Sequence, residues 1–145
     1  MTTGEADAPV RVPATPAGLR VAAEALQAFG ARAGWPAATT WQLHVALDEA
    51  LSNIVRHGGS GEIDVSFRTD GKFAEMTVED DGPPFDPLAH PAPDLRGALE
   101  TRRPGGLGVA LIRSLMDEVR YERTYRNVLV LRKRLAPGAA RQETR

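Results

Sequence analysis

The sequence of 145 residues has no cysteine, and this absence excludes several functions at once. Without a thiol the chain has no disulfide bond, no thiolate ligand for a metal ion and no cysteine nucleophile. It also lacks an apolar run of the roughly 18 residues that a membrane-spanning helix requires. The first residues, MTTGEADAPV, contain neither the basic nor the apolar segment of a secretory signal. We therefore expect a cytoplasmic protein that has no membrane partner.

An excess of charge of either sign is missing as well. The chain has 18 Lys and Arg residues against 19 Asp and Glu residues, which gives a net charge of −1. The overall electrostatics therefore offer no reason for direct binding to nucleic acid. A hydrophobic fraction of 42% is ordinary for a globular protein, and the length favours one domain with its own core.

Two kinds of periodicity predict the secondary structure. Apolar residues recur at helical spacing in the N-terminal part, where Thr15-Pro16 begins one helix and Gly58 ends another. From Glu62 on, apolar and polar residues alternate as in half-buried strands. The expected elements are a strand at 10–12, helices at 16–33 and 39–58, strands at 62–67 and 73–78, a helix at 107–117, and strands at 119–124 and 127–134. This order predicts an α+β fold, a two-layer sandwich in which helices cover one face of a mixed, mainly antiparallel sheet.

A long segment rich in proline and glycine interrupts this pattern. Five prolines lie between residues 83 and 93, and the segment ends with Pro104-Gly105-Gly106. A loop of this length inside a compact domain is usually a lid or a binding loop. We expect one domain over 10–136 with a lid at about 83–106, and disordered tails at 1–9 and 137–145.

The helix expected at 39–58 contains the segment LDEALSNIVRHG, at residues 47–58. Glu49 and Asn53 lie about 40° apart around such a helix, away from its apolar stripe and therefore from the core. The pair is part of either a solvated face or a site, and asparagine is a poor residue for the middle of a helix. An amide oxygen suits Mg²⁺, and a carboxylate one turn earlier can accept a proton from an attacking hydroxyl group. His57, two turns beyond Glu49, is either a ligand contact or a cation at the helix end.

The segment VEDDGPPFDP, at residues 78–87, follows the strand expected at 73–78. Asp80 ends the alternating pattern, and Gly82 allows the backbone to approach a planar ring closely. A carboxylate in this place can accept a hydrogen bond from the amino group of a base. Taken alone, Asp-Asp-Gly is typical of an ordinary turn, and we expect Asp81 to be an exposed turn residue.

The third segment, RRPGGLGVALIRSLMD at residues 102–117, is a glycine-rich turn that runs into a helix. Its backbone N–H groups and the positive end of the helix dipole can bind an anion, although such turns are also common structural elements. No GKS or GKT follows, so the turn is not a Walker A loop, and no dinucleotide-binding fingerprint is present. Thr101 and Arg103 either reach the phosphates of a ligand or stay in solvent. The turn residues expected at the phosphates are Gly105, Gly106, Leu107, Gly108 and Val109.

In this order the three segments resemble the N, G1 and G2 boxes of the GHKL ATPases, and more closely those of the anti-sigma factor serine kinases in that superfamily. Glu49 and Asn53 match the pattern E-x-x-x-N. Asp80 and Gly82 match D-x-G-x-G, whereas Pro84 replaces the second glycine. The resemblance covers about half of the chain. It implies the Bergerat, or histidine kinase-like, fold and binding of ATP with Mg²⁺: Asp80 contacts adenine, Asn53 holds the metal ion and Glu49 is the catalytic base.

The resemblance also implies a function. It is that of a protein-serine/threonine kinase that phosphorylates an anti-sigma factor antagonist, sequesters a sigma factor and forms a homodimer. The family's partner surface surrounds the first helix and strand, so we expect Arg20 to contact a partner. The alternative is a nucleotide-responsive module that binds its partner without phosphorylating it. A histidine-kinase catalytic fragment would require a dimerising helix pair with a phosphoacceptor histidine, and no histidine precedes residue 40.

Overall fold

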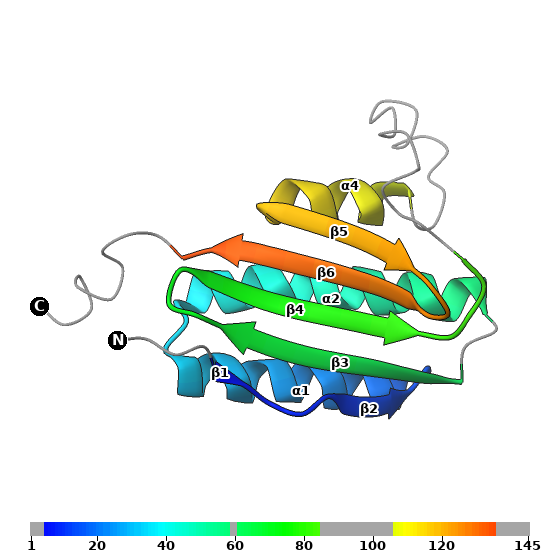
Figure 1. Ribbon diagram of the computed structural model, residues 1–145, viewed down its shortest axis with the longest axis horizontal. Coiled ribbons are helices and arrows are strands. Elements are labelled where there is room, and N and C mark those ends of the chain that lie inside the picture. The colour runs from blue at the N-terminus through cyan, green and yellow to red at the C-terminus, as the bar shows by residue number, and fades with distance from the viewer. Residues whose placement is uncertain (1–4, 59–60, 85–105, 136–145) are drawn as a thin grey trace, which may run out of the picture.

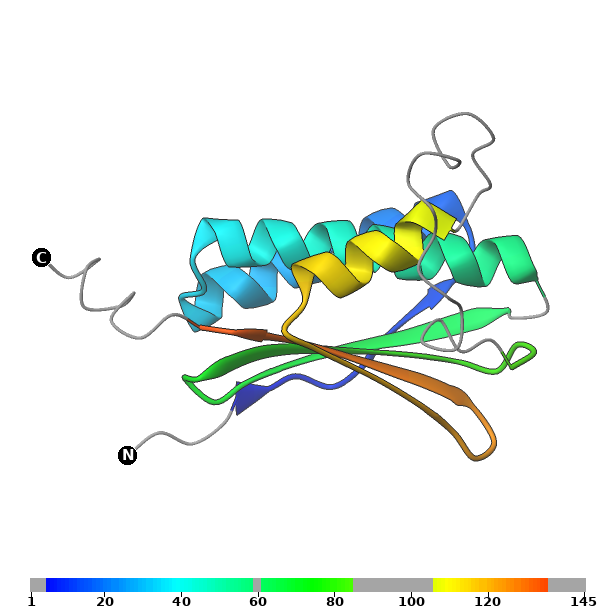
Figure 2. The same cartoon turned by 90° about the horizontal axis from the view of Figure 1, so that it is seen from above.

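The computed structural model describes residues 5–58, 61–84 and 106–135. The elements, in chain order, are β1 (Glu5–Ala6), β2 (Val10–Pro13), α1 (Pro16–Ala33), α2 (Ala37–His57), β3 (Glu62–Thr69), β4 (Phe73–Asp80), α4 (Gly106–Leu115), β5 (Glu118–Arg123) and β6 (Asn127–Arg134). These strands form one sheet, and the three helices that the structure describes lie on the same face of it (Figures 1 and 2). The predicted α+β sandwich with helices on one face is therefore confirmed.

The sheet has the strand order β1-β3-β4-β6-β5, and β2 also pairs with β3. Every pair among the described strands is antiparallel, so the sheet that we expected to be mainly antiparallel is wholly so in this part of the chain. The register places Asp80, the last residue of β4, opposite Ile63 on one side and Asn127 on the other. Two segments far apart in the sequence therefore meet at this end of the sheet.

Local sequence explains where α1 begins and ends. The hydroxyl oxygen of Thr15 accepts a hydrogen bond from the Gly18 N–H at 3.1 Å, and Pro16 supplies a suitable first residue. Gly34 ends the helix with φ of 75°, a left-handed conformation that glycine adopts without steric cost. The helix has the bounds predicted from the sequence.

The core fills the space between the helical layer and the sheet. Alternating residues of β3 and β4 point to the helices, and the apolar faces of α1 and α2 cover them. Its largest fully buried side chains include Leu26, Leu43, Leu47, Leu51, Ile63, Met76, Ile112 and Leu131. Gly30 allows α1 to approach α2, because a Cβ there would lie 2.7 Å from the Thr40 hydroxyl oxygen. The core therefore fixes α2 above the centre of the sheet.

The structure differs from the sequence-based expectations mainly at element ends. Residues 5–6 form β1, although we expected a disordered tail over 1–9. This strand is too short for periodicity to reveal, and it forms because its backbone pairs with Thr69 and Arg68 of β3. Residues 85–105, which make up most of the expected lid, and the expected tail at 137–145 lie outside the described residues. Of the helices that the structure describes, none is long and apolar enough to cross a membrane.

Candidate functional site

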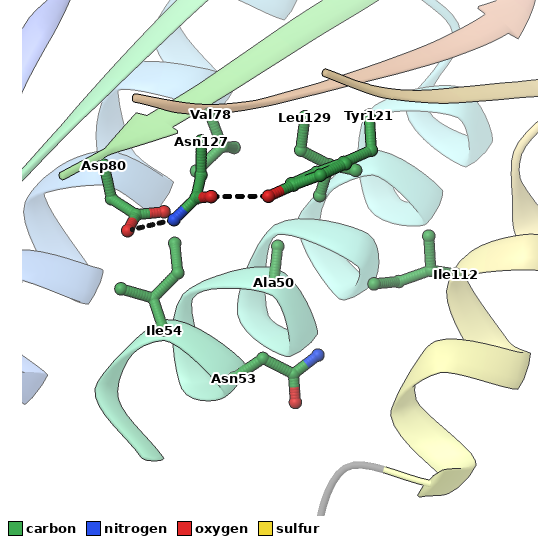
Figure 3. Close-up of a pocket in the computed structure, with 9 residues that line it drawn as sticks. All are labelled: Ala50, Asn53, Ile54, Val78, Asp80, Ile112, Tyr121, Asn127 and Leu129. Atoms are coloured by element: carbon green, nitrogen blue, oxygen red, sulfur yellow. Dashed lines mark hydrogen bonds between the residues drawn. The ribbon is translucent and has the colours of Figure 1, made fainter. Parts of the chain in front are cut away.

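A pocket lies between the helices and one end of the sheet. Figure 3 shows its lining, which α2, β4, α4, β5 and β6 supply together. The lining residues are Ala50, Asn53, Ile54, Val78, Asp80, Ile112, Tyr121, Asn127 and Leu129. A second hollow beside it is lined by Asn53, Ile54, His57, Gly58, Asp80, Pro83 and Asn127. The fold thus brings together three residues that the sequence singled out, namely Asn53, His57 and Asp80.

Asp80 is the main charged group of this site. Its side chain points to the helical layer because Asp80 continues the inward-facing positions of β4, and it is 6% exposed. Its Oδ1 atom accepts hydrogen bonds from the Gly82 N–H at 2.8 Å and from the Asn127 amide at 3.0 Å. Gly82 is itself buried next to the carboxylate. A negatively charged acceptor is therefore held in a fixed orientation against a mainly apolar pocket.

Asn53 lines the same pocket as Asp80 from the helical side, although we expected it on a face away from the core. It is 4% exposed, because α4 and the sheet end enclose this side of α2. Its amide oxygen accepts a hydrogen bond from the Arg56 guanidinium, a contact that the sequence did not predict. The buried position supports a role in a site rather than on a solvated face.

Glu49 and His57 lie one turn before and one turn after Asn53 on α2. Glu49 is half-buried and lines neither hollow. Within the described residues its carboxylate makes no hydrogen bond or ion pair, so both oxygens are available to accept a proton or a hydrogen bond. His57 is exposed at the end of α2 and lines the second hollow.

The glycine-rich segment supplies the start of α4. Gly106, Leu107, Gly108 and Val109 form the first turn of this helix, so their N–H groups lie at its positive end. Figure 3 shows this end of α4 on the side of the pocket to which the Asn53 side chain points. The predicted residues Thr101, Arg103 and Gly105 lie outside the described residues.

The sequence did not single out Asn127, which the structure places beside Asp80. Asn127 begins β6 and is 6% exposed. Its amide oxygen accepts hydrogen bonds from the Tyr121 hydroxyl at 2.5 Å and from the Arg123 guanidinium at 2.9 Å. The only signal in the sequence was a polar residue at an inward-facing strand position. That signal points to Asp80 only once the pairing of β6 with β4 is known.

An ion-pair cluster on the other face of the sheet fixes the turn before Asn127. The Arg126 guanidinium lies 2.9 Å from one Asp64 oxygen, and the Arg11 guanidinium lies 2.9 Å from the other. Hydrogen bonds from Arg11 and then Arg126 hold the pKa of Asp64 below its ordinary value, so this carboxylate is charged at neutral pH. The cluster therefore ties the β5–β6 hairpin to β3.

Arg20 lies apart from the pocket. It is exposed on α1 and lines a groove between α1 and α2. The other residues of this groove are Leu19, Ala23, Glu24, Gln27, His44 and Asp48, and none of them lines the pocket or the second hollow. Any role of Arg20 therefore concerns a surface separate from the pocket.

Among the described residues, Asn53 is the one that we expected to hold a metal ion at this site. The described part of the chain contains no group of three or more histidine and acidic side chains that could hold a metal ion. An amide oxygen such as that of Asn53 fits Mg²⁺, which takes one or two protein oxygens and completes its shell with phosphates and water. The Asn53 side chain, which carries an amide oxygen, points toward the start of α4 (Figure 3).

Comparison with known proteins agrees with this geometry. The family model described as a histidine kinase-like ATPase domain matches residues 12–133. The serine-protein kinase RsbW of Oceanobacillus iheyensis is 31% identical over 140 residues, which cover 88% of this chain and 85% of the relative. The serine/threonine-protein kinase BtrW of Bordetella bronchiseptica is 32% identical over 102 residues, 68% of this chain and 72% of the relative. The chain therefore belongs to the histidine kinase-like ATPases, and within them to the anti-sigma factor serine kinases.

Proposed function

We propose that the protein binds ATP in the pocket between α2, α4 and the sheet, and transfers the γ-phosphate to a serine or threonine side chain of a protein. The observation that carries this proposal is the buried Asp80 carboxylate, which is held by Asn127 and Gly82 against an apolar pocket. A carboxylate so placed accepts a hydrogen bond from the amino group of adenine. Membership of a family of serine-protein kinases is consistent with this use of the pocket.

The walls of the pocket suit the planar base. Val78 and Leu129 approach from the sheet and Ile112 from α4, and these side chains offer apolar contact to both faces of a ring. The apolar walls bind any base, whereas the single carboxylate discriminates between bases. Binding and selection are therefore supplied by different residues.

The phosphates of the nucleotide would lie toward the start of α4. There the N–H groups of Gly106, Leu107, Gly108 and Val109 and the positive helix end favour an anion. Asn53 would hold Mg²⁺ through its amide oxygen, and the Arg56 guanidinium would leave that oxygen when the metal ion binds. When bound, Mg²⁺ neutralises charge on the phosphates. We include Thr101, Arg103 and Gly105 in the phosphate site as part of the same proposal.

Glu49 would act as the general base of the transfer. The serine or threonine oxygen attacks the γ-phosphorus, the bond from that phosphorus to the β–γ bridging oxygen breaks, and ADP leaves with the electron pair. Glu49 accepts the hydroxyl proton, a role for which its half-buried and uncommitted carboxylate is suited. No covalent intermediate on the enzyme is required.

A thermal melt followed by a phosphotransfer assay tests the function. Mg-ATP at about 100 times its dissociation constant should stabilise the protein by about 2.7 kcal/mol, which raises the melting temperature by several degrees. Mg-ADP should stabilise the protein as well, since the contacts with adenine and with the metal ion remain. Label from γ-³²P-ATP should then appear on serine or threonine of the protein substrate. A shift with both nucleotides but no transfer to any antagonist would favour the partner-binding module instead.

We propose that the protein substrate is an anti-sigma factor antagonist, that the chain also sequesters a sigma factor, and that it works in the cytoplasm as a homodimer. Arg20 would contribute to a partner surface, since it is exposed at a groove separate from the nucleotide pocket. Arg20→Glu should therefore weaken capture of at least one partner by about tenfold, as for loss of one charged interface contact. It should leave the shift with Mg-ATP unchanged.

The control for this variant is Arg120→Glu, which reverses an exposed charge on β5, far from the groove along the sheet. This control should leave the affinity for both partners unchanged. Binding of both partners by Arg20→Glu with wild-type affinity would remove Arg20 from the partner surface. The measurement is titration of each partner by calorimetry, with and without nucleotide.

A further inference from the structure

The orientation of the Asn127 amide is fixed by its neighbours. The amide oxygen accepts hydrogen bonds from the Tyr121 hydroxyl at 2.5 Å and from the Arg123 guanidinium at 2.9 Å. A carbonyl oxygen has two lone pairs, and these two donors use both of them. The amide nitrogen must therefore face the other way, toward Asp80, as Figure 3 shows.

The amide nitrogen of Asn127 holds the end of β4 and the turn after it. It lies 3.0 Å from Asp80 Oδ1, 3.0 Å from the Pro83 carbonyl oxygen and 3.3 Å from the Gly82 carbonyl oxygen. The turn is thus attached to β6 through one side chain. Because the ion pair between Arg126 and Asp64 fixes the adjacent residue of the chain, Asn127 has little freedom to move away.

These contacts leave the two oxygens of Asp80 unequal. Oδ1 accepts two hydrogen bonds, from the Gly82 N–H and from the Asn127 amide, which fill both of its lone pairs. Within the described residues Oδ2 accepts none. Asp80 therefore offers one oxygen to a ligand, although a free carboxylate would offer two.

One available oxygen has a consequence for the choice of base. Adenine presents a single amino group beside a ring nitrogen that is an acceptor, so one carboxylate oxygen satisfies it. Guanine presents two adjacent N–H donors, N1–H and the 2-amino group, which pair with both oxygens of a carboxylate. With Oδ1 filled, one guanine donor would be buried without a partner, and such a loss weakens binding strongly.

We propose that Asn127, oriented by Tyr121 and Arg123, is a positioning residue that makes the pocket select adenine over guanine by filling Asp80 Oδ1. This inference rests on the proposed ATP site. It adds a determinant that acts through Asp80 and that lies 47 residues further along the chain.

The test uses two variants of equal shape, Asn127→Thr and Asn127→Val. Residues 127 and 80 are directly paired across the strands, so a threonine hydroxyl can still donate to Asp80 whereas valine cannot. For Asn127→Val we expect the ratio of the GTP to the ATP dissociation constant to fall by at least about tenfold. For Asn127→Thr this ratio should stay within about threefold of wild type, since one donor is retained. Calorimetric titration with ATP and with GTP, each with Mg²⁺, gives both constants.

A control separates selection from general damage to the pocket. Leu129→Ala shortens an apolar wall, so it should raise both dissociation constants by a similar factor and leave their ratio unchanged. If Asn127→Val does not fold, Tyr121→Phe takes its place, because it removes one of the two donors that orient the amide. A reduced ratio in that variant supports the inference.

The outcomes distinguish this inference from the proposed function. If wild type binds ATP tightly and Asn127→Val keeps the wild-type ratio, the inference is overturned while the ATP site stands. An equal fall of the ratio in Asn127→Thr and Asn127→Val would also overturn it, because the hydroxyl donor would then not matter. If wild type binds neither nucleotide, the proposed function fails and the inference fails with it.

Discussion

Glu49→Gln is expected to lower the rate of phosphotransfer by at least about a hundredfold, because general-base catalysis contributes about 10²–10⁴ to such reactions. The substitution keeps the shape of the side chain and removes its ability to accept the proton. Affinity for Mg-ATP should change little, since Glu49 lines neither the pocket nor the second hollow. The effect should therefore appear in kcat and not in the melting shift caused by the nucleotide.

The matched control is Glu122→Gln, which removes one exposed carboxylate from β5. Transfer by this variant should equal that of wild type. Initial rates with γ-³²P-ATP and the antagonist protein measure both variants in the same assay. Transfer retained by Glu49→Gln would exclude Glu49 as the base, and the proton would then have to pass to another group or to water.

This experiment also separates the two functions that the sequence left open. A kinase and a binding module both require Asn53 and Asp80, so nucleotide affinity cannot distinguish them. Only the kinase requires a base next to the phosphates. If the wild-type protein transfers phosphate and Glu49→Gln does not, this measurement shows directly that the protein is a kinase.

The helices and the sheet follow from local patterns in the sequence. Thr15 and Pro16 predict the start of α1 and Gly34 ends it, because capping and helix termination depend on residues close in the chain. Alternation identified β3 and β4, but the predicted end of β4 at Val78 was two residues short. The apolar residues of β4 end at Val78, and the polar residues Glu79 and Asp80 belong to the strand because both neighbouring strands pair with them.

The site was predictable only as far as its residues lie in short motifs. Asn53 and Asp80 were found from their segments, and the fold places both on one pocket. The side chains that form hydrogen bonds with these two residues were not found. The contact of Arg56 with Asn53 depends on the rotamer of the arginine side chain. The contact of Asn127 with Asp80 depends on a strand register that pairs residues 47 positions apart. Residues 53 and 56 lie at helical spacing, but neither the rotamer that joins them nor the register that joins residues 80 and 127 can be predicted from the sequence, so only the three-dimensional structure reveals these contacts.

Asn53→Ala is expected to abolish the Mg²⁺-dependent part of the stabilisation by ATP. In wild type, about 2.7 kcal/mol of stabilisation is expected from Mg-ATP at about 100 times its dissociation constant. Without the amide oxygen the metal ion loses its proposed protein ligand, and the phosphates lose the link to α2 that the ion provides. Thermal melts with ATP are recorded in excess Mg²⁺ and in excess EDTA. The Mg²⁺-dependent part is the difference between the two shifts of the melting temperature.

Asn53→Asp is the matched variant, because a carboxylate oxygen is also a good ligand for Mg²⁺. It should keep a Mg²⁺-dependent shift, whereas Asn53→Ala should show the same shift with EDTA as with Mg²⁺. The difference within each variant cancels any loss of packing, since that loss is present under either condition. A full Mg²⁺-dependent shift in Asn53→Ala would mean that the metal ion is held without this amide. The buried Asn53 side chain would then serve its contact with Arg56 alone.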